Sequence, residues 1–534
     1  MRKKFHYLLL GIGGAYSLTC SDIYAAEPHQ LADFTTSVHQ ETTTAGHNPA
    51  FLTVLSLPAH LSYLQVSAHI GQGSFYNYQQ SKHHTQGGIH TESYYRLNRN
   101  ITLYGAMGYL QSKGKDMEGT AFINPSAPFH IVEASSSNKG DKKMETYHLQ
   151  GGIGWKALPQ LSIGASIDYT AANYAKYKDL RHKNTLMDMQ VAAGINWQIN
   201  QAWAVGLSYH YHRNNEAVEF ATYGNKDIQY YSLISYGNFY GLKEAFGESG
   251  YTASRTPLFT EWHGLSLQGL WYLSPRLQWF SEVFFHSPKG RFGKGTSTSV
   301  TFTTHEGTDK GYNGRLSYRK GNCTHIIDGG ISCHNLKNYE NSYKESTDES
   351  NVTQIIYYGS NEVMDRKEWK GKLDYTLYAG RAGRNPKWIT GIRTSFYARN
   401  TTTSVYPYYR KQDLHQIEAI AHAARSIPHR KGVYTLRLQA GYGTGGGTLK
   451  EDDLYTTPGS NQQAPFSRED LLLQEFEYYT APRSLAETSL RYEYAWSEKL
   501  ELYGEVSYQY TRAYRTTQTG TDRHDIGLHI GCRF

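Results

Sequence analysis

The chain has 534 residues, of which 39% are hydrophobic, 14% aromatic and 19% charged, and its formal net charge is +7. This low charged fraction excludes a disordered polyelectrolyte, and no Lys/Arg block of the kind that binds nucleic acid is present. The 46 Tyr and 51 Gly residues suit a β-barrel, in which one side of each strand meets lipid and the other meets water.

Residues 1–25 have the pattern of a secretory signal peptide. Arg2, Lys3 and Lys4 form the positive start, residues 8–12 belong to an apolar centre, and Ala25 precedes the expected cleavage site. No later stretch has 18 consecutive apolar residues, which leaves no helical membrane span. An exported chain of this kind predicts an outer-membrane barrel, because a closed sheet satisfies its backbone hydrogen bonds in lipid.

Residues 26–60 contain no clear strand and are expected to form a periplasmic segment ahead of a barrel formed by residues 61–534. A barrel of roughly sixteen strands is wide enough to be an aqueous channel unless something fills it. Two parts of this chain could do so: the segment 26–60, acting as a hatch, or a long loop folded inward. We therefore expect low or gated conductance.

From residue 61 the chain reads as pairs of alternating strands joined by short turns. The turns lie at 98–100, 158–160, near 200, 274–275, 385–386, 428–429 and 498–499. This pattern predicts an all-β antiparallel transmembrane barrel of about sixteen strands, within 14–18. The long connections 111–145, 213–262, 288–370 and 443–484 are expected to be extracellular loops. A further hairpin within 288–370, around 300–304 and 352–358, would raise the count to eighteen.

The last strand alternates clearly between apolar and polar or glycine positions. Its apolar positions are Ile526, Leu528, Ile530, Cys532 and Phe534. A final strand of this kind, ending on Phe, resembles the closing strand of bacterial outer-membrane barrels. The resemblance implies that this strand pairs with the first strand and that Phe534 is part of the signal read by the barrel-assembly machinery.

Charged residues opposite the apolar faces are expected to line the lumen: Arg437, Glu487, Arg491, Glu493, Glu501, Glu505 and Arg533. Both signs are mixed, so we expect these groups mainly to neutralise one another, without strong ion selectivity. Cys323 and Cys333 lie in a polar segment of an expected extracellular loop and could form a disulfide there.

The chain has 24 His residues, and His210 and His212 share one strand face. Histidine is the commonest metal ligand, so a metal or haem capture site is one possibility; lumen polarity is the other. No nucleophile–base or paired-acid constellation is evident. We therefore predict no enzyme activity, no catalytic residues, no cofactor and no resident metal.

Two family resemblances bear on function. Asn48-Pro49-Ala50, ahead of the first strand, resembles the amino-terminal motif of the long-chain fatty acid transporter family, whose segment folds into the lumen as a hatch near bound hydrophobic ligands. This chain is longer and has more predicted strands than is usual in that family. The whole arrangement is more similar to an uncharacterised family of Bacteroidota outer-membrane barrel proteins, known as a domain of unknown function, which implies a barrel and no particular activity.

These patterns favour passive transport through a porin-like or hydrophobic-solute channel in the outer membrane of a Gram-negative bacterium. The alternatives are a non-transporting surface protein whose long loops bind a partner, and an accessory to haem or metal uptake. The expected partners are outer-membrane lipid and lipopolysaccharide, the barrel-assembly machinery, and an unknown solute or surface ligand; nucleic acid is not expected.

Overall fold

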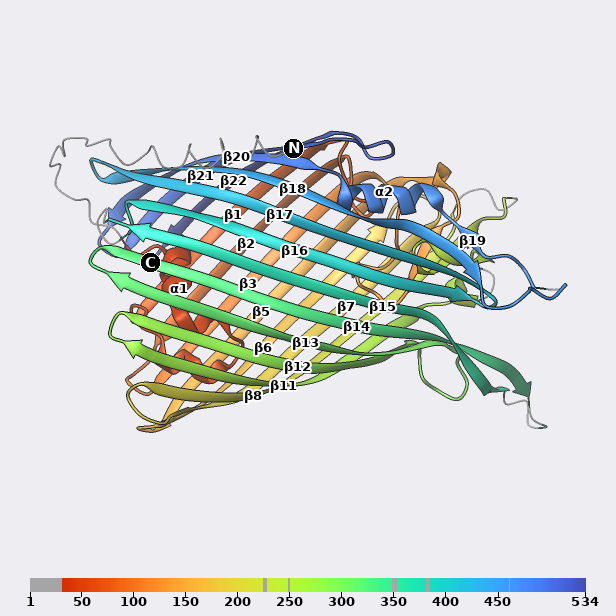
Figure 1. The fold of residues 1–534 in the computed structure, drawn as a ribbon, viewed down its shortest axis with the longest axis horizontal. Coiled ribbons are helices and arrows are strands. Elements are labelled where there is room, and N and C mark those ends of the chain that lie inside the picture. Colours follow the sequence, from red (N-terminus) through yellow and green to blue (C-terminus); the bar gives the residue numbers. More distant parts are fainter. Residues whose placement is uncertain are drawn as a thin grey trace, which may run out of the picture.

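The structure, a computed structural model, describes residues 31–223, 228–247, 250–347, 349, 353–380, 385–460 and 462–534. The predicted signal peptide lies outside these residues. The described chain forms a closed antiparallel barrel of 18 strands, strongly tilted against the long axis (Figure 1). The strands are β1 (His60–Gly73), β2 (His83–Arg96), β3 (Ile101–Met117), β5 (Gly140–Leu158), β6 (Leu161–Lys176), β7 (Arg181–Gln198), β8 (Trp203–Ala221), β11 (Thr256–Ser274), β12 (Leu277–Gly293), β13 (Thr301–Lys320), β14 (Cys323–Thr347), β15 (Thr353–Ala379), β16 (Trp388–Val405), β17 (Tyr408–His429), β18 (Gly432–Leu454), β20 (Arg483–Ser497), β21 (Leu500–Ala513) and β22 (Asp522–Arg533).

The barrel closes where β22 pairs with β1, in a register that runs from Tyr63 opposite Arg533 to Gly73 opposite Arg523. Ile526, Leu528 and Ile530 point outward and are exposed, as the alternation predicts. The last residue continues the ladder, because its N–H and carbonyl oxygen bond to the backbone of Ser62 at 3.1 and 3.2 Å. The predicted all-β barrel and its closure by the last strand are therefore confirmed.

The predicted count of about sixteen strands is too low by one hairpin, whereas the alternative of eighteen strands matches the observed number. The two segments expected to form the further hairpin fall on β13 and β15, which each pair with β14 and not with one another. Most of the connection 288–370 is strand: it holds β13, β14 and parts of β12 and β15, with a short turn at 321–322. The alternation fails here because the outer faces carry charges that pair across strands. Glu306 lies opposite Lys289 on one side and Lys337 on the other, and Lys337 lies opposite Asp365. Opposite charges in direct cross-strand contact stabilise a sheet. These strands therefore continue beyond the part of the barrel whose outward side chains are apolar.

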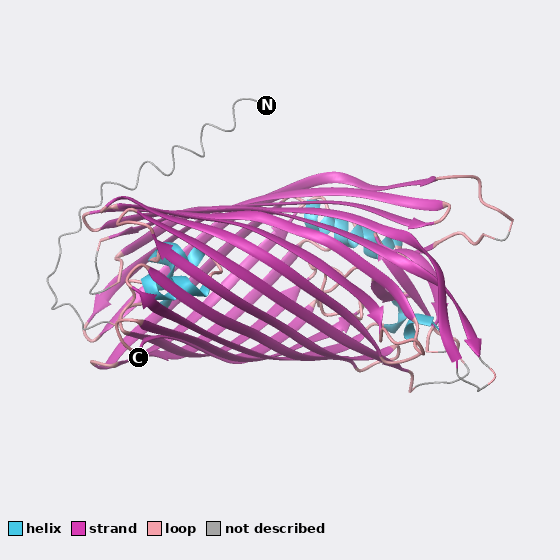
Figure 2. Cartoon of the chain, turned by 90° about the horizontal axis from the view of Figure 1, so that it is seen from below, coloured by secondary structure: helices cyan, strands magenta, loops and turns pink. Residues whose placement is uncertain are grey.

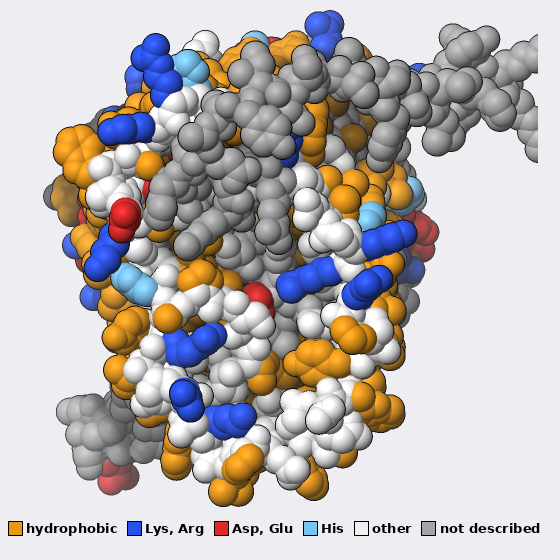
Figure 3. Space-filling view, turned by 90° about the vertical axis from the view of Figure 1, so that its left-hand side faces the viewer, with side chains coloured by type: hydrophobic (Ala, Val, Ile, Leu, Met, Phe, Trp, Pro, Cys, Tyr) orange, Lys and Arg blue, Asp and Glu red, His pale blue; other side chains and the backbone are white. Residues whose placement is uncertain are grey.

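The short turns and the C-terminus lie at one end of the barrel, called here the short-turn end, and the long connections lie at the other (Figure 1). Seen from the short-turn end, more Lys and Arg than Asp and Glu side chains show around the rim (Figure 3). Exposed cations at or beside the short turns are Arg99, Lys156, Arg276, Lys320, Lys431 and Lys499.

Helices lie inside the barrel near both ends (Figure 2). Residues 31–59, which we call the plug, form α1 (Phe34–Gln40), η2 (Thr42–Ala45) and η3 (Pro49–Val54) toward the short-turn end. Toward the long-loop end, β4 (His130–Glu133), β9 (Tyr231–Gly237), β10 (Tyr240–Ala245) and β19 (Phe466–Ser467) form a second sheet, with α2 (Glu469–Thr480) against it. We call this sheet, α2 and their connecting loops the cap; among the loops are the short helices η4 (Ser136–Asn138) and η5 (Gly250–Thr252). Among the described residues, no helix is both long and apolar enough to cross a membrane.

Candidate functional site

The motif Asn48-Pro49-Ala50 is buried inside the barrel, where it begins η3 of the plug. It rests on glycines of adjacent wall strands. A Cβ atom at Gly164 would collide with the backbone of Pro49 and Ala50, and one at Gly194 would collide with the Asn48 side chain. Neither glycine has a positive φ, so their backbone conformation does not require glycine. Glycine is needed at these two positions because a side chain would occupy the space where the plug packs.

Asn48 fixes the plug to the wall by hydrogen bonds in several directions. Its Oδ1 accepts from the Ala50 N–H at 2.9 Å, which caps η3. Its Nδ2 donates to the Ile195 carbonyl oxygen and to Gln268 Oε1, each at 3.0 Å. An amide is suited to this place because it offers donors and an acceptor at once.

Arg315 on β13 holds the plug backbone. Its guanidinium donates to the carbonyl oxygens of His39 and Glu41 at 3.0 and 2.8 Å, and its Nε donates to Asp328 at 2.6 Å. His39 of α1 completes the network through contacts of 2.9 Å with Asp328 and 2.7 Å with the Tyr378 hydroxyl. The wall thus supplies the groups that satisfy the polar atoms of this part of the plug.

Asp33, the N-cap of α1, brings the plug to the predicted lumen charges near the short-turn end. One carboxylate oxygen accepts from the Thr36 N–H at 2.9 Å, and the other pairs with Arg533 at 2.8 Å and Arg491 at 3.6 Å. Burial alone would raise the pKa of Asp33, but the two guanidinium groups and the Thr36 N–H lower that pKa to about 2. Arg533 also pairs with Glu493 at 2.8 Å and with Glu501.

The other predicted lumen residues lie on the same inner wall, beside or beyond this cluster. Glu505 lies directly opposite Arg491 across β20 and β21. Arg437 and Glu487 are on β18 and β20, on the faces opposite the exposed Leu436, Leu438 and Leu490. The seven predicted positions therefore form a mixed-charge wall, of which Arg491, Glu493, Glu501 and Arg533 meet at the base of the plug.

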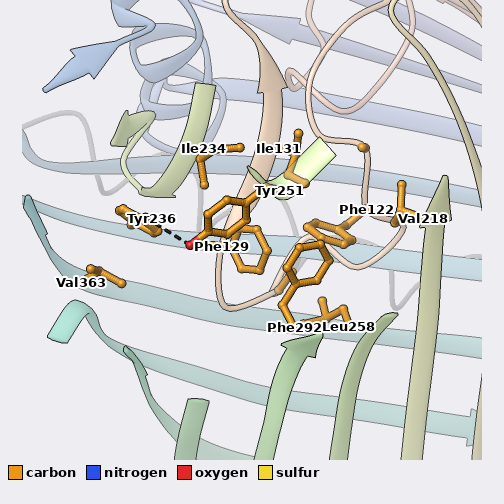
Figure 4. Packing of buried hydrophobic residues seen from close by; sticks show 12 residues of the cluster. Phe122, Phe129, Ile131, Val218, Ile234, Tyr236, Tyr251, Leu258, Phe292 and Val363 are labelled. Carbon is orange, nitrogen blue, oxygen red and sulfur yellow. Dashed lines mark hydrogen bonds between the residues drawn. The ribbon is translucent and has the colours of Figure 1, made fainter. Parts of the chain in front are cut away.

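The cap has an aromatic core of its own (Figure 4). On one face of the inner sheet, Ile234 and Tyr236 join Phe129 of the β3–β5 loop and Tyr251 of the β8–β11 connection. These residues pack against wall side chains that include Val218, Leu258, Phe292 and Val363. On the other face, Val132, Leu233 and Phe239 pack on Leu471 and Leu472 of α2. The inner sheet is thus buried on both faces, between the wall and α2.

An ion pair and a set of backbone hydrogen bonds fasten α2 to the barrel. Arg399 on β16 binds both carboxylate oxygens of Glu475 on α2, at 2.9 and 2.6 Å. At the far end of α2, Glu477 accepts from the backbone N–H groups of residues 517, 518 and 519 in the β21–β22 connection. Parts of three of the connections that the sequence predicts as loops, 111–145, 213–262 and 443–484, therefore fold inward as one packed unit, whereas 288–370 is mostly wall strand.

A cavity of about 820 Å³ lies above the plug. Plug residues including His47, Asn48 and Phe51 line one side, and β2, β3, β5 to β8 and β11 to β13 line the rest. A second cavity of about 210 Å³ shares Trp262 and Asp309 with the first and is bounded by cap residues 124–128. Together they form what we call the chamber, a space between plug and cap that is suited to holding a small ligand.

Histidines and carboxylates line the chamber. His212 pairs with Asp188 at 2.9 Å and stacks on Trp262, with ring centres 4.0 Å apart. His148 pairs with Asp168 at 2.8 Å and His334 with Asp309 at 2.9 Å. Sequence reasoning singles out His210 and His212, and the structure places both on the chamber wall. In the described part of the chain, no three His, Cys, Asp or Glu side chains converge closely enough to hold a metal ion by themselves.

His47 is the plug's contribution to this lining. Its Nδ1 contacts Glu282 of β12 at 2.8 Å, and its backbone N–H donates to the same carboxylate at 3.1 Å. The hydrogen bond to Glu282 raises the pKa of His47 above its ordinary value, although burial opposes the shift. A ligand in the chamber would therefore lie beside a side chain of the plug itself.

The predicted disulfide between Cys323 and Cys333 is wrong, and both thiols are free. Cys323 begins β14 and Cys333 lies ten residues further along the same strand. At about 3.3 Å per residue the two Cα atoms are roughly 33 Å apart, whereas a disulfide needs them within about 7 Å. Cys323 also follows the short turn at 321–322, so it lies at the opposite end of the barrel from the long connections.

Comparison with known proteins places the chain in a family. Residues 49–534 match the "Family of unknown function (DUF6850)". The chain belongs to this family. Its expected membership of a family of unknown function is thus confirmed, while the family's description gives no activity and no bacterial group. No curated protein matches the chain.

Several solved structures are similar to this family member in outline. The ferric preacinetobactin receptor BauA from Acinetobacter baumannii has 8% identity and a TM-score of 0.41, covering 89% of this chain and 80% of that one. The outer membrane transporter YddB from Escherichia coli has 7% identity and a TM-score of 0.37, covering 88% and 80%. The ferric enterobactin receptor PfeA from Pseudomonas aeruginosa has 6% identity and a TM-score of 0.39, covering 89% and 80%. These values are too low for any property of those proteins to be transferred to this chain.

Proposed function

We propose that this protein is an outer-membrane uptake barrel of a Gram-negative bacterium, closed at rest, which holds a small polar ligand in its chamber and releases it when the plug moves. The observation that carries the proposal is the chamber's position, with the plug on one side and cap residues 124–128 on the other. The proposal orients the barrel with its short-turn end facing the periplasm. The expected partners, which are lipopolysaccharide, membrane lipid and the assembly machinery that reads Phe534, belong to the same proposal.

The plug is the part that the proposal sets in motion. Its contacts through Asp33, His39, His47 and Asn48 are hydrogen bonds and ion pairs, which water can replace when the segment leaves the wall. The cap is held by a buried aromatic core, whose exposure to water would cost much more.

The positions of the plug, the cap and the chamber also bear on the three other functions considered for this barrel. A porin-like channel that is open at rest is disfavoured, because plug and cap occupy the lumen at both ends. A surface protein that acts only through its loops has no need of the chamber. A role in haem or metal uptake gains support from the histidines that line the chamber wall.

Conductance in planar bilayers tests the proposal. The mature chain is expected to conduct poorly, and a variant that lacks residues 26–58 is expected to open a stable pathway, because the plug is then gone. A synthetic peptide of residues 26–58, added from the short-turn side, serves as the control and should close the pathway again. A mature chain that conducts like an open porin would contradict the proposal, and so would a deletion variant that stays closed to ions and small sugars.

A further inference from the structure

A histidine pair in the chamber is made possible by one glycine. His210 on β8 and His286 on β12 are both opposite Gly264 of the strand between them, β11. A Cβ atom at position 264 would collide with the His286 ring. Because Gly264 has no side chain, the His286 ring lies over it, and the two ring centres are 5.7 Å apart.

The nitrogens of this pair are poised for a ligand. The Ser208 hydroxyl engages Nε2 of His210 at 2.9 Å, so Nδ1 is the nitrogen that would coordinate. Nε2 of His286 is buried and has no hydrogen-bond partner among the described residues. A buried polar atom without a partner is costly, and a bound ligand that accepts its lone pair would remove that cost.

The spacing of the two rings fits coordination of one metal ion. An imidazole nitrogen about 2.1 Å from a metal puts the ring centre roughly 3.2 Å from it, so two rings on opposite sides would have centres about 6.4 Å apart. The observed 5.7 Å lies between this value and the roughly 4.5 Å of two ligands at a right angle. It corresponds to an angle of about 125° at the ion, which differs from the straight line between the two axial positions of a haem.

We propose that His210 and His286 bind a borderline transition-metal ion, such as Cu²⁺ or Ni²⁺, that arrives in a partial chelate with open coordination positions. The proposal rests on the proposed uptake function and names its substrate class. Imidazole nitrogen suits such ions. No third His, Cys, Asp or Glu of the described residues joins the pair closely enough to complete a site, so the cargo must bring its remaining ligands with it.

The neighbouring residues favour such a complex. Asp309 lies opposite His286 across β12 and β13 and also lines the chamber. Its carboxylate adds negative charge beside a bound cation. Phe284 stacks against His286 with ring centres 5.3 Å apart, which fixes the ring's orientation. The chamber, at about 820 Å³, has room for the chelating molecule in addition to the ion.

Binding of copper(II) iminodiacetate to untagged, detergent-solubilised mature protein tests the proposal. This probe leaves positions open for two imidazoles, and calorimetry with electron paramagnetic resonance would report one site per chain with two histidine nitrogens. His286→Ala and Gly264→Ala are each expected to weaken binding about tenfold or more, the range seen when a metal site's supporting groups are perturbed. Gly264→Ala is the sharper variant, because it removes no ligand and only displaces His286.

His422→Ala is the matched control, since His422 lies on β17, outside the strands that line the main cavity, and its variant should bind like the wild type. Equal affinity of Gly264→Ala and wild type overturns the proposal, as does a site that survives in the His210→Ala/His286→Ala double variant. A parallel titration with haemin distinguishes haem from a metal chelate as the ligand. If both histidines bind haemin more tightly than they bind the copper chelate, the chelate assignment is overturned. Binding in detergent needs no transport, so the uptake proposal can fail in bilayers independently of this one.

Discussion

Plug and cap both lie inside the lumen, but they are held there by different physics. The cap buries an aromatic core in which Phe122, Phe129, Tyr236, Tyr251 and Phe292 meet wall residues. The plug has smaller apolar contacts, such as Phe51 on Phe280 with ring centres 5.6 Å apart. Alongside two small apolar clusters, polar groups of the wall reach plug backbone and side chains. Under the proposed function, the plug should therefore leave without unfolding the barrel, whereas the cap should stay as long as its core is intact.

The largest expected effect comes from breaking the cap core. Phe129 is 1% exposed, and its ring contacts those of Phe122, Tyr251 and Phe292. Phe129→Ala should lower the local stability of the cap by about 3–5 kcal/mol, because it leaves a cavity. Hydrogen exchange of residues 229–246 would rise, while the barrel's thermal transition would stay in place. Tyr358→Ala, at a position that is 71% exposed, serves as the control; equal exchange in both variants would mean that the cap does not depend on this core.

A smaller effect is expected where the plug meets the wall glycines. Gly164→Val keeps an allowed strand conformation but collides with Pro49 and Ala50, so it should destabilise the docked plug by about 1–3 kcal/mol through overpacking. The expected result is more frequent opening in planar bilayers. Gly151→Val is the matched control, because the nearest atom to a Cβ there lies 3.7 Å away. The contact of the plug with the wall glycines Gly164 and Gly194 is called here the glycine seat. If both variants open equally often, this glycine seat does not retain the plug.

The barrel itself could be predicted from the sequence because the proposed position in lipid imposes a simple rule on strands. The outward positions Ile526, Leu528 and Ile530 are apolar and exposed, so alternation and short turns such as 98–100 and 498–499 are visible without any structure. The rule ends where the apolar outward positions end. There the outward positions carry charges such as Lys289, Glu306 and Lys337, and β13 and β14 are missed; the opposite signs across successive segments are the signal that could have revealed them.

The chamber could not be predicted because it depends on pairing across distant strands. His210 and His286 come together through the registers of β8, β11 and β12 around Gly264, and no local pattern encodes those registers. The cap is similar. Phe129 and Ile234 lie in connections that read as extracellular loops, and their inward packing requires contacts with the wall. Aromatic residues in predicted extracellular loops, such as Phe129 and Tyr251, are the sequence signal that could have indicated inward folding.

The smallest expected effect concerns pH and the carboxylate at the base of the plug. Asp33 has a pKa of about 2, held down by Arg533 and Arg491 against burial, whereas a free Asp has a pKa of about 3.9. A lowered pKa contributes stability that is present above about pH 3.9 and is lost as the pH falls through about 2. Acid should therefore loosen the plug, and part of that effect should disappear in Asp33→Asn, which cannot titrate.

Opening frequency between pH 5 and pH 2 measures this difference. Glu493 and Glu501 face the same guanidinium groups, so only the difference between wild type and Asp33→Asn reports on Asp33. At neutral pH the variant should already open somewhat more often, because a charge-assisted bond worth roughly 1.5–3 kcal/mol becomes a neutral one. Asp141→Asn, whose partner Lys113 is half exposed, is the control and should follow the wild type. Parallel pH profiles for wild type and Asp33→Asn would show that the plug is retained by its glycine seat and its contacts with Arg315, and not by this ion pair.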